Sequence, residues 1–234
     1  MKAEPAIEML QEIKNTIFSQ VYSIKNDDLA IFTQIETIIC KKSSTCYEIP
    51  VEIKKLLSLC EDESLHLLLN TVYNPLTPKL LIKEYTTDEE YPSFISLQED
   101  IEYMDNTIIS EDAEKKDLEG LSYDDTQKDY IDTKISNIYE FMPLYDSGSF
   151  CLILIDLREQ YFGRLINYVS GYANVLAPNL YAHIDDLIDG LKNEYYTYDP
   201  NWGDIEYPLS WYQRKLLRTG EYYYDSSLGK VMKL

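Results

Sequence analysis

The stretch from Phe141 to Leu191 decides the fold, and it reads FMPLYDSGSFCLILIDLREQYFGRLINYVSGYANVLAPNLYAHIDDLIDGL. Turn-forming residues at 146–149 separate two apolar runs, and Gly148 can adopt the positive φ that a tight hairpin turn needs. Between Phe150 and Leu157 both alternating sets of side chains are apolar, so neither face of this strand can be exposed to solvent. We therefore predict a hairpin whose second strand is the central strand of a sheet.

The residues after this hairpin predict a third strand and then a helix. Gly163 opens an apolar run from Arg164 to Val169, which we expect to form the third strand. Pro178 marks the approach to a helix. Its apolar positions fall at i, i+3, i+4 and i+7 and form one face, made of Ile184, Leu187, Ile188 and Leu191.

This stretch resembles the conserved core of the SUKH superfamily, which includes many bacterial immunity proteins and a yeast regulator of cell-wall synthesis. The resemblance is carried by Phe141, Pro143, Asp146, Gly148, the apolar strand ending in Asp156, Gly163 with Leu165 and Ile166, and the helix entered through Leu180 to Ile184. Two features depart from the family: Ser149-Phe150 follows the turn glycine, and the chain continues well beyond the last family helix. Because members share a scaffold while their partners differ, the resemblance indicates fold more strongly than function.

The part of the chain before this core predicts helices and a strand. Helical spacing indicates a first helix after Pro5, a second helix and a third helix after Pro50; their apolar faces are Leu10, Ile13, Ile17 and Val21, then Ile31, Phe32, Ile35, Ile38 and Ile39, then Ile53, Leu56, Leu57 and Cys60. We expect a strand from Leu80 to Tyr85 and either a strand or a helix from Ser64 to Val72. A capping box at Ser96 to Glu99 predicts a helix beginning at Leu97.

We thus expect one α+β domain over residues 1–234, with a mainly antiparallel central sheet flanked by N-terminal and C-terminal helices. Residues 110–134 are acidic and poor in apolar side chains, which is typical of a mobile insertion. Residues 194–234 form a Tyr/Trp-rich C-terminal extension, in which a last helix through Tyr212, Leu216 and Leu217 ends at Gly220.

The charge of the chain excludes some partners and favours others. The 41 acidic residues against 21 basic ones give a net charge of −20, which argues against binding to nucleic acid or anionic membranes and favours a basic protein partner. The alternative is an acidic surface that only keeps the protein in solution. The sequence shows neither a secretory signal nor an apolar run long enough to cross a bilayer, so we expect a cytosolic protein.

The cysteines and histidines do not predict a disulfide or a metal site. Cys40, Cys46, Cys60 and Cys151 have no close paired spacing, and His66 and His183 lie apart from them. We therefore expect buried thiols, no metal and no cofactor. The sequence also lacks a phosphate-binding loop and a nucleophile elbow, and its many carboxylate pairs are unremarkable in so acidic a chain. We do not expect an enzyme.

Clustered tyrosines and tryptophans among acids are the candidate binding residues. Such side chains bury a large area at little rotamer cost and are enriched where proteins bind proteins. The candidates for partner contact are Tyr145, Asp146, Tyr195, Tyr198, Asp199, Trp202, Asp204 and Tyr207. The same aromatics could instead pack the C-terminal extension onto the helices. For Asp146 and Asp156 we favour a structural role, in which each carboxylate binds nearby backbone amides.

The resemblance, joined to the charge, implies an immunity protein that binds and neutralises a cognate bacterial toxin by occluding its active site. The target implied is a basic, nuclease-type toxin domain of the polymorphic or contact-delivered kind. The alternative is a non-enzymatic regulatory scaffold that uses a SUKH-like domain to recruit cellular proteins.

Limited proteolysis tests the predicted insertion. We expect brief digestion to cut first within 110–134 and to leave a folded remainder, because its acids cannot bury enough apolar surface to offset the entropy lost on ordering. Mass spectrometry of the first fragments would locate the cuts. Strong protection of its backbone amides from hydrogen exchange would contradict the prediction.

Overall fold

The computed structural model describes residues 3–43, 45–59, 74–86, 137–146, 151–169, 172–199, 204–206, 216–225 and 230–234. Several predicted features lie outside these ranges: the segment from Ser64 to Val72, the helix beginning at Leu97, the insertion at 110–134, and the side chains of Trp202 and Tyr207. They remain predictions.

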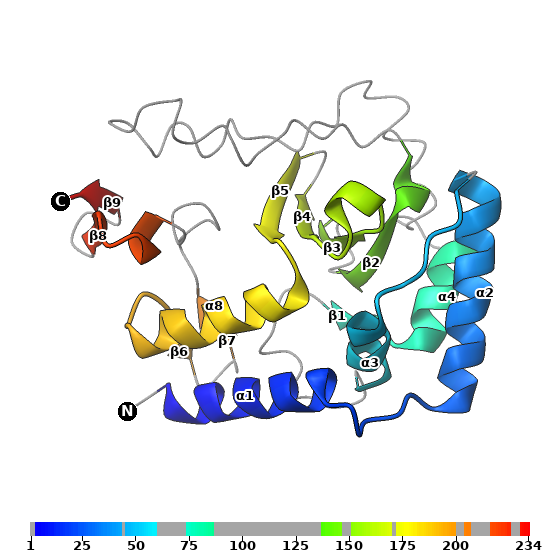
Figure 1. Cartoon of the computed structure of the whole chain (residues 1–234), viewed down its shortest axis with the longest axis horizontal. Helices are drawn as coiled ribbons and strands as arrows, with labels where there is room; N and C mark the ends of the chain where they lie inside the picture. Colours follow the sequence, from blue (N-terminus) through cyan, green and yellow to red (C-terminus); the bar gives the residue numbers. More distant parts are fainter. Residues whose placement is uncertain are drawn as a thin grey trace.

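A five-stranded antiparallel sheet lies at the centre of the molecule (Figure 1). Its strands, in spatial order, are β1 (Asn74–Pro75), β2 (Phe141–Asp146), β3 (Cys151–Asp156), β4 (Leu165–Val169) and β5 (Tyr172–Ala177). Strand β3 is the middle strand, and its side chains Ile153, Leu154 and Ile155 are buried. Because successive side chains point to opposite faces, both faces of β3 are covered. The predicted hairpin, central strand and α+β class are confirmed.

The edge strand β5 was not predicted from the sequence. It pairs antiparallel with β4, with Asn174 opposite Asn167 and Val175 opposite Ile166. The signal that could have revealed it is Ser170-Gly171, a turn-forming pair between two runs of strand-forming residues.

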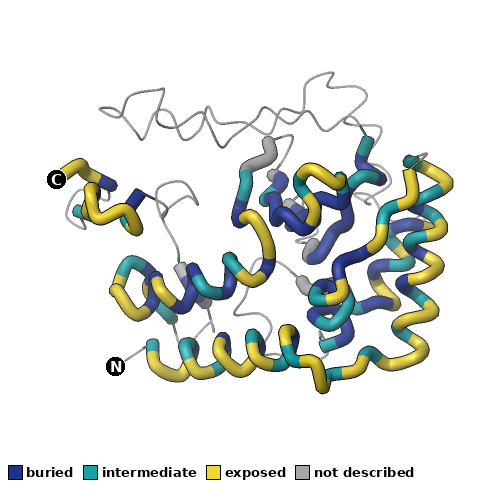
Figure 2. The backbone as a smooth tube through the Cα atoms, viewed as in Figure 1, coloured by how far each residue is buried: buried dark blue, intermediate teal, exposed yellow. Residues whose placement is uncertain are grey.

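Helices pack beside and beneath the sheet. The first three are α1 (Glu4–Phe18), α2 (Asn26–Ser43) and α3 (Val51–Leu59), close to the predicted positions. Figure 2 shows the strands mostly buried and the outer faces of α1 and α2 exposed. One residue differs: Val21, expected on the buried face of α1, is 90% exposed. The reason is that α1 ends at Phe18, so the helical spacing no longer applies beyond it.

The predicted strand from Leu80 to Tyr85 is wrong, because this segment lies in helix α4 (Pro78–Thr86). Thr77 caps the helix by accepting a hydrogen bond from the backbone N–H of Leu80 at 3.3 Å, and Pro78 suits the first helical turn. The buried positions are Pro78, Leu81 and Tyr85, of which the last two lie four residues apart. Proline followed by this i, i+4 spacing is the helical signal that the short apolar run obscured.

Tyr85 anchors α4 to the sheet. Its hydroxyl donates a hydrogen bond to the carbonyl oxygen of Phe141 in β2 at 3.1 Å, and its ring lies against Tyr139. Burial, with smaller contributions from Tyr139 and Glu84, raises the pKa of Tyr85 well above its usual value. The neutral hydroxyl therefore remains the bound form throughout the physiological range.

Helix α8 (Leu180–Lys192) follows the sheet as predicted and packs beside α1 (Figure 1). The side chain of Asn179 caps it by accepting from the backbone N–H of Ala182 at 2.8 Å. Lys14 of α1 forms an ion pair with Asp185, and its ammonium lies 3.9 Å from the ring centroid of Tyr181. Partial burial lowers the pKa of Lys14, but its bonds to Asp185 and Tyr181 together raise it.

The buried carboxylate of Asp156 closes the connection between β3 and β4. It is 0% exposed and accepts hydrogen bonds from Arg158 Nε at 2.8 Å and from Arg164 Nη2 at 2.7 Å. It also accepts from the backbone N–H of Arg158 at 3.2 Å, as the structural interpretation of this residue required. Gly163, at φ +84°, makes the turn that brings Arg164 back to it. Asp156 therefore fixes how the chain leaves the central strand.

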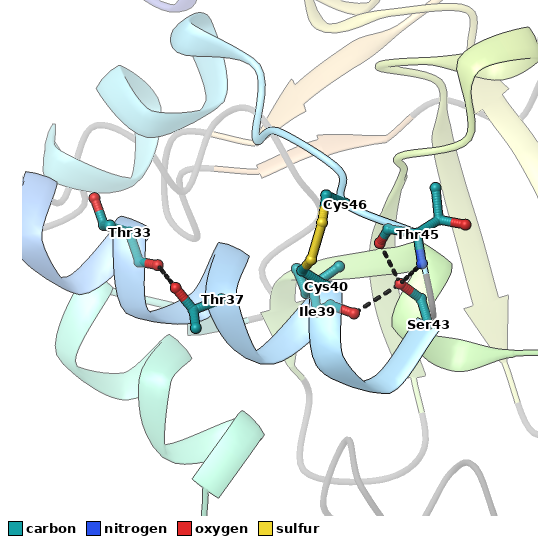
Figure 3. The surroundings of a disulfide bond; sticks show 7 residues. All are labelled: Thr33, Thr37, Ile39, Cys40, Ser43, Thr45 and Cys46. Carbon is teal, nitrogen blue, oxygen red and sulfur yellow. Dashed lines mark hydrogen bonds between the residues drawn. A yellow bond between two sulfur atoms is a disulfide. The ribbon is translucent and has the colours of Figure 1, made fainter.

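Cys40 and Cys46 form a disulfide, so the prediction of four thiols, all buried, is wrong (Figure 3). Helix α2 ends at Ser43 and the chain turns back, which brings the two Cα atoms to 4.1 Å. The Ser43 hydroxyl lies within hydrogen-bonding distance of the Ile39 and Thr45 carbonyl oxygens and so supports this turn. Spacing alone did not reveal the pair, because it depends on where α2 ends.

Replacing Asp156 with Ala tests its role in the fold. We expect the free energy of unfolding to fall by about 3 kcal/mol, because the charge of the buried Arg164 loses its counterion. Denaturant unfolding would measure the change. The matched control is Asp189→Ala, an exposed acid 3.9 Å from Arg218, which should change stability by less than about 1 kcal/mol. Similar small effects in both variants would contradict the assigned role.

Candidate partner-binding surface

Part of the predicted binding cluster lies in a short hairpin after α8. Strands β6 (Thr197–Asp199) and β7 (Asp204–Glu206) pair antiparallel and place Tyr198 opposite Ile205, and Asp199 opposite Asp204. The fold thus brings Tyr198, Asp199 and Asp204 together, with Tyr195 just before them.

The tyrosines of this segment do not all serve the same purpose. Tyr196 is buried, whereas Tyr195 and Tyr198 are half-buried and pack against the hydrophobic core. Packing of the C-terminal extension therefore accounts for the position of Tyr196 fully and for those of Tyr195 and Tyr198 in part. The exposed portions of Tyr195 and Tyr198 remain open to a partner.

Asp186 of α8 holds the C-terminal extension in place. Its carboxylate accepts hydrogen bonds from the hydroxyl of Tyr196 at 3.0 Å and from Arg218 Nη2 at 2.7 Å. Arg218 lies in a helical turn at 216–218, just before the hairpin of β8 (Tyr222–Asp225) and β9 (Lys230–Lys233). One buried carboxylate thus joins two distant segments to the same helix.

Gly190 makes this arrangement possible. A Cβ atom built on Gly190 would lie 2.1 Å from ring atoms of Tyr196, so only glycine allows the ring to lie against α8. Sequence reasoning missed the group formed by Asp186, Tyr196 and Arg218. The available signal was a glycine inside an otherwise regular helical pattern, which often marks a close approach.

A small pocket opens beside this group. It has a volume of about 160 Å³ and is lined by residues that include Asp189, Asn193, Tyr195 and Arg218. Ligand sites for small molecules usually occupy about 300 to 1,000 Å³. The pocket therefore suits one side chain of a protein partner better than a substrate.

The remaining predicted residues lie elsewhere or outside the described chain. Tyr145 and Asp146 end β2, where they pair with Pro75 and Asn74 of β1. Figure 1 places β2 in the central sheet, away from β6 and β7 below α8. The structure therefore does not join Tyr145 and Asp146 to the C-terminal cluster.

The described residues form no metal-binding cluster. Among them, no group of three or more His, Cys, Asp or Glu side chains could hold a metal ion. His183 is buried within α8. In the same part of the chain, no helix has the length and apolar character needed to cross a bilayer.

Comparisons with models of protein families, with curated proteins and with solved structures find no match to this chain.

The variant Gly190→Ala tests the contact with Tyr196. In a solvent-exposed helix this change stabilises by up to about 1 kcal/mol, but overpacking against the ring should instead destabilise by about 1 to 3 kcal/mol. Thermal and denaturant unfolding would give the sign. In a Tyr196→Ala background the ring is gone, so adding Gly190→Ala should be neutral or stabilising. A stabilising effect of Gly190→Ala alone would show that the ring does not lie there.

Proposed function

We propose that this chain is an immunity protein that binds the catalytic domain of a cognate bacterial toxin and neutralises it without catalysis of its own. The partner is a basic protein, most simply a nuclease domain, whose active site the bound chain covers. The SUKH-like residues between Phe141 and Ile184 supply the link to immunity proteins. The α+β fold, with the antiparallel hairpin of β2 and β3 at its centre, is the arrangement that this resemblance implies.

The placement of acids at neighbouring positions carries the proposal. Glu4, Glu8 and Glu12 are exposed and follow one another at intervals of four residues on α1. Like charges four residues apart on a helix destabilise it by a few tenths of a kcal/mol per pair. The repulsion among Glu4, Glu8 and Glu12 does not stabilise the fold, and a basic partner would relieve it.

Recognition would combine long-range attraction with close contact. With a net charge of −20, the chain attracts a basic domain and raises the rate of encounter. Half-buried aromatics such as Tyr195 and Tyr198 then supply the contact area from which water is excluded. The acids around them take the place of the toxin's anionic substrate, so that the active site is blocked.

We place the protein in the cytoplasm, where a toxin that enters the cell would act. The disulfide of Cys40 and Cys46 is the observation that weighs against this compartment, because stable disulfides are rare there. Cys46 is exposed, so the cytosolic thiol pool can reach the bond.

Co-expression with candidate toxin domains tests the proposal and finds the partner. The chain should restore growth to cells that express its cognate toxin and should bind the purified toxin. The association rate should fall markedly between low and physiological salt, while the dissociation rate changes less. Trp202→Ala or Tyr198→Ala should each weaken binding by about 2 kcal/mol, and Asp199→Lys should mainly slow association.

Kinetics that do not depend on salt would contradict the electrostatic part of the proposal. If a folded variant with Ala at Tyr198, Trp202 and Tyr207 together binds normally, the C-terminal aromatics are not the site. If the chain protects cells from no basic toxin domain, the immunity function itself is rejected.

A further inference from the structure

The outer face of α1 carries an open groove that the sequence did not predict. The buried face of α1, which packs against the core, is formed by Ala6, Leu10, Ile13 and Ile17. The opposite face and the segment after the helix border a shallow, open groove with a volume of about 660 Å³, lined by residues that include Glu8, Gln11, Glu12, Asn15, Val21 and Tyr22. The groove is larger but more open than the pocket beside Asp186, so it suits a segment of a protein partner better than a small molecule.

An apolar side chain is held in water at the edge of this groove. Val21 is 90% exposed, more than any other large apolar side chain in the described ranges. Its position is supported, because its backbone N–H donates to Ser19 Oγ at 3.1 Å, and the carbonyl oxygen of Ser19 accepts from Lys55 Nζ at 2.5 Å. A single exposed apolar residue is common on protein surfaces, but Val21 borders the acidic groove, where an apolar side chain of a partner would cover it.

The groove is also negatively charged. Glu8 and Glu12 line it, and neither forms an ion pair with any residue that the structure describes. The nearest lysine along the helix, Lys14, is already bound to Asp185. Since Glu8 and Glu12 lie four residues apart, their carboxylates fall side by side along the groove.

Two aromatic rings meet where α1 packs beside α8. Phe18 and Tyr181 meet edge to face with ring centroids 5.1 Å apart, and they are 37% and 48% exposed. The ammonium of Lys14 already lies over the ring of Tyr181, which shows that this ring accepts a cation. Phe18 and Tyr181 do not line the groove, but both are partly exposed, one on α1 and one on α8.

We propose that the α1 groove, formed by Glu8, Gln11, Glu12, Asn15, Val21 and Tyr22, is the docking site for a basic amphipathic segment of the partner protein. Lysine or arginine side chains of that segment bind Glu8 and Glu12, and an apolar side chain covers Val21. The inference rests on the proposed function and names the face that holds the basic partner. It adds a contact face on α1 to the one that the C-terminal aromatics supply.

A synthetic peptide tests the groove without knowledge of the partner. The probe is a fluorescein-labelled amphipathic helix of Lys and Leu, and the control probe has Glu in place of every Lys. Fluorescence anisotropy at physiological salt should show binding of the Lys peptide only. Hydrogen exchange on the complex should show added protection within residues 8–22.

Matched charge reversals distinguish the effect of the groove acids on binding from the effect of the net charge of the chain. We expect Glu8→Lys/Glu12→Lys to weaken binding of the Lys peptide at least tenfold, and Val21→Ser to weaken it several-fold. The control Glu48→Lys/Glu159→Lys reverses two exposed acids elsewhere, so its net charge equals that of the groove variant. It should change the affinity less than threefold. Circular dichroism would confirm that each variant is folded.

Three outcomes would overturn the inference: no preference of the wild-type chain for the Lys peptide, equal loss of binding in both reversals, or added protection only outside residues 8–22. The immunity function is judged separately, by protection of cells from the cognate toxin. If Glu8→Lys/Glu12→Lys still protects as well as the wild-type chain, the groove is rejected and the immunity function stands. If the wild-type chain protects against no toxin, the immunity function fails whatever the peptide shows.

Discussion

The central strand β3 has apolar side chains on both of its faces, and the rest of the fold is arranged to cover them. Ile153 and Leu154 point to opposite sides of the sheet and are both buried. A strand of this kind is stable only as an interior strand between two neighbours, with packed elements over the sheet. The hairpin with β2, the return through β4 and the helices around the sheet all meet this requirement.

Two buried carboxylates then decide how the chain leaves its regular elements. Asp156 binds Arg158 and Arg164 where β3 passes into β4, and Asp186 binds Tyr196 and Arg218 where the C-terminal extension meets α8. A buried ion pair adds little net stability compared with apolar packing, but loss of one partner is strongly destabilising. Such groups therefore specify one arrangement of segments. In this protein Asp186 fixes the position of the extension that carries most of the predicted binding residues.

The distribution of charge connects the fold to the proposed function. Lys14 and Arg218 are bound to acids of α8, so they do not neutralise the acids that face solvent elsewhere. Glu8 and Glu12 in the α1 groove remain without a counterion in the described part of the chain. The net charge follows from composition, but the fold concentrates the uncompensated part of it on particular faces. A basic partner would meet those faces first.

The sequence by itself determined the class of fold, the central strand and most helices, because burial in one strand or on one helix face leaves a local period in the chain. It also determined the charge, and hence the kind of partner that we propose. The sequence pattern wrongly predicted a strand where α4 forms, because a short apolar run fits the period of a strand as well as that of a helix. The sequence pattern also did not reveal the disulfide of Cys40 and Cys46. Only the tertiary structure decided what depends on distant segments meeting. The contact of Tyr196 with Gly190, the sharing of Asp186 with Arg218 and the groove beside Val21 are of this kind, because no local pattern encodes the positions of such partners.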